Sequence, residues 1–123
     1  FAKLGTGLTE SSGVYSFPST GHYLIQFIAF LSNSNAEERF CKAFIEVTED
    51  NSSFNSANDT RTSLAGSSNQ RNGSIHCSHV FDVTNTTNDK FKVGVDHSDS
   101  NTVVHGDSNT NETYIIVTKL ADT

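Results

Sequence analysis

The feature that most constrains the fold is a series of short apolar segments, each separated from the next by polar residues rich in Gly, Asn and Ser. No segment repeats apolar side chains every three or four residues over several turns, as an amphipathic helix requires. Ser, Thr and Asn make up 43 of the 123 residues, and their side chains compete with helical backbone hydrogen bonds. Nine Phe and three Tyr still supply apolar surface for a core, which a disordered polar chain lacks. An all-β domain with polar loops is therefore predicted.

The length of the chain is enough for one core and too short for two. We expect a single domain, residues 1–123, that forms the C-terminal part of a longer chain, because the sequence begins at Phe1 and contains no Met. Its eight Lys and Arg are scattered and its formal net charge is −6, which argues against nucleic-acid binding. The apolar run at 23–31 is much shorter than a membrane span, so no membrane insertion is expected.

Strand-like segments recur about every ten residues, as in a β-sandwich or jelly roll. The expected strands are 13–17, 22–32, 39–48, 74–84, 90–96 and 112–120, with a short edge strand near Leu64. The stretches 50–72 and 97–111 are expected to be long polar loops. The predicted fold is a two-sheet antiparallel jelly-roll sandwich of seven or eight strands.

Two of these segments are apolar on both faces. In segment 90–96 only one face is apolar, since Phe91, Val93 and Val95 alternate with Lys90 and Lys92. Segments 23–30 and 114–120 place apolar side chains at both odd and even positions. A two-layer sandwich covers only one face of each strand, so the second face predicts self-association. The alternative is a loop of the same chain folded over that face.

Several segments resemble the C1q and tumour necrosis factor family. GVYSFPSTGHYLIQF at 13–27 resembles the signature of complement C1q globular heads, in which an aromatic-Pro turn precedes Gly-x-Tyr and an apolar strand. GHYLI at 21–25 is also similar to the corresponding strand of tumour necrosis factor cytokines. NDKFKV at 88–93 resembles the Gly-Asp-x-Val-x-Val strand of the family, and residues 114–122 resemble its closing aromatic strand.

The sequence also departs from this family. Ile116 stands where the family usually has Gly, the opening aromatic strand is mostly missing, and no collagen repeat is present. A secreted complement-like protein of animals is therefore not implied. The Asn- and Ser-rich loops and the ending KLADT resemble the globular heads on virion fibre proteins of marine bacteriophages.

The resemblance implies a ten-stranded C1q/TNF-like jelly roll that forms a tight homotrimer, with segment 23–30 and the closing strand lining the threefold axis. The trimer-interface residues that it implies are Leu24, Gln26, Ile28, Tyr114, Ile116 and Thr118. The core residues that it implies are Tyr23, Ile25, Phe27, Ile115 and Val117.

No catalytic site is predicted. Asp107 lies in a Gly-Asp-Ser sequence similar to the nucleophile block of one esterase class, but no histidine follows it to act as a base. His76 and His79 form the densest set of potential metal ligands with the cysteine between them. On a strand these two histidines point to opposite faces, so they cannot chelate one ion without a bulge.

Calcium is the one cofactor that the sequence suggests, with Asp96, Asp99 and Asp107 as its candidate ligands because they place carboxylates in one loop region. Their spacing matches no defined calcium loop, and solvated acidic turns are the alternative. Cys41 and Cys77 either form a disulfide between neighbouring strands or are buried thiols.

The expected function is that of a non-enzymatic trimeric head on a virion fibre or another extracellular protein. The polar loops 51–72 and 97–111 are expected to recognise a receptor or glycan, since a rigid β scaffold presents them. The alternative is a structural trimerisation or capsid-decoration module that binds no host molecule. A third hypothesis is a secreted complement-like or cytokine-like ligand.

Overall fold

The computed structural model describes residues 5–34, 38–65 and 71–123, and strands are the only regular secondary structure in these residues. The strands are β1 (Thr9–Ser11), β2 (Val14–Ser16), β3 (Gly21–Asn33), β4 (Glu38–Thr48), β5 (Asn55–Leu64), β6 (Arg71–Val83), β7 (Lys90–His97), β8 (Thr102–His105) and β9 (Tyr114–Ala121). All their pairings are antiparallel. The predicted all-β antiparallel class is therefore confirmed.

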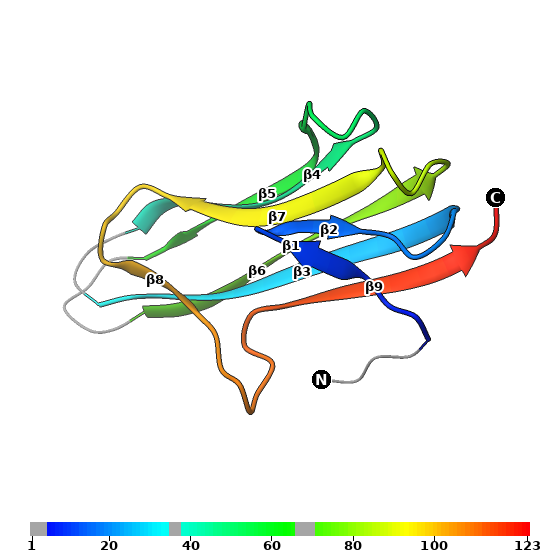
Figure 1. Ribbon diagram of the computed structural model, residues 1–123. Helices are drawn as coiled ribbons and strands as arrows, with labels where there is room; N and C mark the ends of the chain where they lie inside the picture. Colours follow the sequence, from blue (N-terminus) through cyan, green and yellow to red (C-terminus); the bar gives the residue numbers. More distant parts are fainter. Residues whose placement is uncertain (1–4, 35–37, 66–70) are drawn as a thin grey trace.

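The strands form two sheets arranged as a sandwich (Figure 1). One sheet has the order β1-β2-β7-β4-β5. In the other, β3 pairs with β6 along one side, while β8 and β9 share its other side. The chain changes sheet between β2 and β3, β3 and β4, β5 and β6, β6 and β7, and β7 and β8. Strand β3 is thus the centre of its sheet.

The core lies between the two sheets and follows the alternation of β3. The inward side chains of β3 from Tyr23 to Leu31 are each at most 4% exposed, and the residues between them are half-buried. Phe17 packs between the sheets, with ring centroids 4.7 Å from Tyr23 and 5.4 Å from Phe91. Burial of each large side chain contributes roughly 1.5–3 kcal/mol.

Both cysteines face this core and neither forms a disulfide. Cys41 is fully buried on β4, and Cys77 is 2% exposed on β6. Of the two alternatives that the sequence left open, the structure therefore has buried thiols. Burial raises the pKa of each thiol to about 11, with smaller contributions from the Glu38 carboxylate for Cys41 and the Asp59 carboxylate for Cys77.

The predicted loop at 50–72 is wrong over about half of its length, and the short edge strand expected near Leu64 is the end of a longer edge strand. Strand β5 occupies ten of these residues and pairs with β4. Its side chains are almost all polar, because β5 is the edge strand of its sheet and only Leu64 at its end is buried. Because the side chains are polar on both faces, apolar and polar residues do not alternate along β5. Most of this strand could therefore not be predicted from the sequence pattern. Strand β8 similarly lies inside the stretch predicted as a loop at 97–111.

Candidate functional site

The outward side chains of β6, β3, β8 and β9 form one continuous surface, which we call the β3 face. The pairing of these strands sets the side chains in rows that run across the sheet. Its three central rows are Val80–Leu24–Thr118, Ser78–Gln26–Ile116 and His76–Ile28–Tyr114.

The central rows of the β3 face contain no Lys, Arg, Asp or Glu. Leu24 and Ile28 are half-buried by their neighbours, whereas Val80 is 54% exposed and Ile116 is 44% exposed. Contiguous exposed apolar surface in a soluble protein commonly marks an interaction site. The β3 face is therefore the candidate functional surface of the domain.

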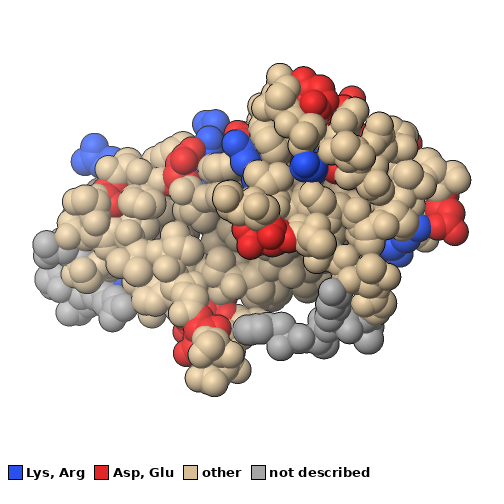
Figure 2. Space-filling view, viewed as in Figure 1, with Lys and Arg blue, Asp and Glu red and all other residues tan. Residues whose placement is uncertain are grey.

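The outer face of the five-stranded sheet has a different chemistry. Each of three Phe rings there lies beside a cation that also binds a carboxylate. The sets are Phe44–Lys42–Asp96 (5.0 Å from Nζ to the ring centroid, 2.7 Å in the ion pair), Phe54–Lys92–Glu46 (4.6 Å and 2.8 Å between the same kinds of atoms) and Phe40–Arg61–Asp59 (5.4 Å from Cζ to the ring centroid, 3.6 Å in the ion pair). Figure 2 shows basic side chains gathered over the β7 side of the molecule. This face covers its own aromatic surface with charged side chains, and the β3 face does not.

The structure separates the residues named from the sequence into two layers. All six implied interface residues lie on the β3 face: Leu24, Gln26, Ile28, Tyr114, Ile116 and Thr118. The five implied core residues point the other way: Tyr23, Ile25 and Phe27 are buried, and Ile115 and Val117 are partly buried against the core. Strand pairing alone places the two sets on opposite faces, because their residues alternate along β3 and β9.

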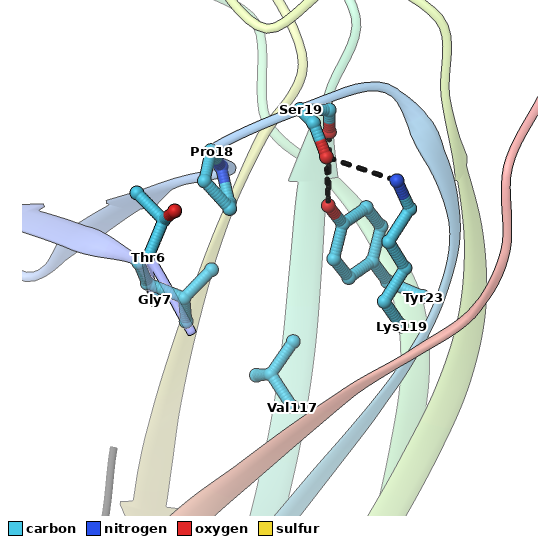
Figure 3. Close-up of a pocket in the computed structure, with 8 residues that line it drawn as sticks. Thr6, Gly7, Pro18, Ser19, Tyr23, Val117 and Lys119 are labelled. Carbon is cyan, nitrogen blue, oxygen red and sulfur yellow. Dashed lines mark hydrogen bonds between the residues drawn. The ribbon is translucent and has the colours of Figure 1, made fainter. Parts of the chain in front are cut away.

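A pocket of about 280 Å³ lies where the chain before β1 meets the ends of β3 and β9 (Figure 3). Leu8, Pro18 and Val117 are among the side chains that line it. Its polar groups bind one another: Tyr23 Oη donates to Ser19 O at 3.0 Å, and Lys119 Nζ donates to Ser19 Oγ at 3.0 Å. Since Lys119 also binds Asp122, these contacts already use the polar groups that a ligand would need.

A buried carboxylate that the sequence analysis did not identify joins three strands. Glu38 Oε1 accepts hydrogen bonds from Phe40 N (2.9 Å) and from the backbone and hydroxyl of Ser98. Its Oε2 accepts hydrogen bonds from Asp99 N (2.9 Å) and Thr102 Oγ1. Asn33 Nδ2 in turn donates to Thr102 Oγ1 at 3.1 Å, which ties β3 to the same cluster. The cluster fixes the β7–β8 connection against the start of β4.

The three calcium candidates do not form one ligand set. Asp96 binds Lys42, Asp99 Oδ1 accepts hydrogen bonds from Asn101, and Asp107 Oδ1 accepts hydrogen bonds from backbone groups of its own turn. Among the described residues, no three His, Cys, Asp or Glu side chains lie together as a metal site requires. Each of these carboxylates is thus engaged locally.

The histidines of β6 lie on opposite faces of their strand, as the sequence predicts. His76 pairs with Ile28 on the β3 face, and His79 pairs with Ile25 on the core side. Desolvation by the core lowers the pKa of His79. One serine–histidine contact was not foreseen, since Ser32 Oγ lies 2.5 Å from His105 Nε2. Ser32 is only 4% exposed, so this contact fastens β8 to β3 rather than presenting a nucleophile.

No protein-family model matches the sequence, and no curated protein matches it significantly. The described residues include no helix with the length and apolarity needed to cross a membrane.

Proposed function

We propose that this chain is a non-enzymatic trimeric head domain with a C1q/TNF-like jelly-roll fold, and that three copies associate through their β3 faces. The head would sit on a virion fibre or another extracellular protein and recognise a receptor or glycan through its loops. The contrast between the two outer faces carries the proposal. One sheet surrounds its exposed rings with its own ion pairs, whereas the β3 face leaves uncharged, partly apolar rows uncovered.

The exposed apolar side chains of the β3 face support a second copy of the chain as its cover. Covering the exposed parts of Leu24, Ile28, Val80, Tyr114 and Ile116 would contribute on the order of 5–10 kcal/mol per subunit before the costs of association. No described loop of the same chain lies over the central rows closely enough to bury Val80 or Ile116. This exposure favours self-association over the alternative in which a loop covers the face.

The order of the strands supports the jelly-roll part of the proposal. The chain passes repeatedly between the sheets, and the segments that resemble the family, β3 and β9, are neighbours in one of them. The segment at 88–93, which resembles another family strand, begins β7 in the opposite sheet.

Recognition is assigned to the loop between β8 and β9, which leaves the edge of the sheet beside Ile28 and Phe30 of β3. The β8–β9 connection projects from the body of the domain (Figure 1) and carries polar residues throughout. Strand β5 occupies ten residues of the other expected loop, at 51–72, and so shortens that part of the recognition surface. That loss is the observation that favours the second candidate function, a structural trimerisation or capsid-decoration module that binds no host molecule.

Sedimentation equilibrium of the wild-type chain and two variants tests the trimer. Ile28→Asp places a carboxylate in the centre of the β3 face and is expected to give a folded monomer. Ser63→Asp adds the same charge at an exposed position on β5, in the other sheet, and is expected to remain trimeric. A monomeric or dimeric wild-type chain, or a trimeric Ile28→Asp variant, would contradict the assigned interface.

Loop replacement separates recognition from a purely structural role. Residues 108–111, inside the β8–β9 connection, would be replaced by Gly and Ser, and binding would be measured on a glycan array and on cells that bind the wild-type domain. Recognition predicts lost binding with the trimer retained. Equal binding by the variant would assign the recognition surface elsewhere, and an absence of binding by the wild-type domain would favour the structural module.

A further inference from the structure

The β3 face holds three of the five histidines of the chain. His22 pairs with Asp82, His76 pairs with Ile28, and His105 pairs with Phe30. The other two histidines lie elsewhere: His79 faces the core, and His97 ends β7, with its Nδ1 2.9 Å from Asp99 O. The histidines are thus concentrated on the surface proposed for assembly.

His76 lies in a central row of this face, and none of the side chains in the three central rows is a carboxylate. Strand β5, which also packs against β6, carries Asp59 in an ion pair with Arg61. The neighbour of His76 on β3 is Ile28, and the next residue in the row is Tyr114 on β9. Tyr114 is the only other titratable side chain in the three central rows. On β6 the outward neighbours of His76 are Ser74 and Ser78. No residue of these rows could neutralise a protonated His76.

The other two histidines of the face differ from His76 in their surroundings. His22 Nε2 lies 3.7 Å from Asp82 Oδ1, one row beyond Leu24. His105 contacts Ser32, and the β8–β9 loop that follows it carries Asp107 and Glu112. Carboxylates are therefore available near the ends of the face and not at its centre.

We propose that the β3 face is a pH-sensitive interface, in which protonation of His76 separates the associated copies. This inference rests on the proposed trimer. Association would cover His76 with the uncharged surface of another copy, and an imidazolium there would lose its water without gaining a carboxylate. Desolvation favours the neutral imidazole, so the assembled state binds fewer protons than the separated chains. Association is therefore strongest above neutral pH and weakens as the pH falls.

The size of the effect follows from proton linkage. Histidine side chains ordinarily titrate near pH 6.5. If assembly excludes the proton completely, each interfacial histidine lowers the association constant by roughly ten-fold at pH 5.5. Three copies of His76 in one trimer then lower it by about 1,000-fold.

Sedimentation equilibrium of the whole chain at pH 7.5 and pH 5.5 tests the inference, with His76→Gln as the informative variant and His97→Gln as the control. The wild-type chain and His97→Gln are expected to be trimeric at pH 7.5 and to dissociate at pH 5.5. His76→Gln, which keeps a polar side chain without a titrating ring, is expected to remain trimeric at both values. Far-UV circular dichroism at both pH values confirms that the chains stay folded, because protonation of the core-facing His79 acts on folding instead.

The outcomes separate the two proposals. A wild-type trimer of equal strength at both pH values overturns the pH-sensitive interface and leaves the trimer standing. Equal dissociation of the wild-type and His76→Gln chains at pH 5.5 also overturns the assignment to His76. A wild-type chain that is monomeric at pH 7.5 overturns the proposed trimer itself.

Discussion

Glu38→Gln is expected to destabilise the domain by about 2–4 kcal/mol. The carboxylate is fully buried and accepts five hydrogen bonds, three of them from backbone N–H groups that cannot turn away. If the side-chain oxygen of the glutamine takes the place of Oε1, it keeps the hydrogen bonds from Phe40 and Ser98. The amide nitrogen then takes the place of Oε2 and faces Asp99 N, so that two hydrogen-bond donors face each other. Leaving a buried donor unpaired costs about 1–3 kcal/mol, and the remaining hydrogen bonds lose their charge assistance. The hydroxyl of Thr102 can rotate to accept from the amide, which limits the loss.

The pH dependence of stability distinguishes this mechanism from a general packing defect. Burial by itself would raise the pKa of the Glu38 carboxyl, but hydrogen bonds from Ser98, Thr102, Phe40 and Asp99 outweigh it and hold the pKa at about 2. An unfolded glutamate titrates near pH 4.3. The stabilisation is therefore fully present above about pH 5 and is lost as the pH falls from there towards 2. Glu38→Gln should lose this part of the acid dependence.

Urea denaturation at fixed chain concentration measures both quantities. Between pH 7 and pH 3.5, the wild-type free energy of unfolding should fall by more than that of Glu38→Gln. Glu46→Gln is the matched control, because Glu46 pairs with Lys92 at the surface and such pairs are worth up to about 1 kcal/mol. A Glu38→Gln effect no larger than that of the control, or an identical acid dependence in wild type and variant, would refute the reasoning.

Three further predictions address the core and the outer face of the five-stranded sheet. Phe91→Ala removes a fully buried ring and should cost about 3–5 kcal/mol in urea denaturation; a loss below 1 kcal/mol would contradict its place in the core. Cys41 and Cys77, whose pKa values burial raises to about 11, should react with a thiol reagent at pH 8 only after denaturation, and rapid labelling of the native chain would contradict their burial. Gly94→Val places side-chain atoms where the Phe44 ring lies, and it should lower the free energy of unfolding by about 1–3 kcal/mol; an unchanged value would show that the ring moves freely.

The sequence predicted the strands whose pattern reflects burial. Strand β3 alternates between core and outer face from Gly21 to Leu31, and apolar side chains lie on both of its faces. Apolar residues at both odd and even positions could therefore be recognised in the sequence. The implied core residues and the implied interface residues lie on opposite faces of β3 and β9. Strand β7 could be predicted in the same way, since Phe91 and Val93 alternate with lysines.

What the sequence did not predict depends on strand pairing rather than on apolar pattern. Only the end of β5 near Leu64 was expected as a strand, because the rest of β5 is held by its pairing with β4 and carries little apolar pattern of its own. The Glu38 cluster joins residues about sixty positions apart, and glutamate at the start of a strand gives no indication of burial. Neither feature could be inferred without the register of the sheets.

The polar turns give a physical reason why the loops can be ordered without a metal ion. Asp50 Oδ1 accepts hydrogen bonds from Ser52 N and Ser53 N, and Asp107 Oδ1 binds the backbone of its own turn in the same way. In the β6–β7 turn, Asp89 Oδ2 accepts from Thr84 N and Asn85 N. Such side-chain caps fix a loop before any partner arrives, which reduces the entropy lost on binding. Part of the abundance of short polar residues therefore supplies the side-chain caps of these turns, while the apolar residues are divided between the core and the β3 face.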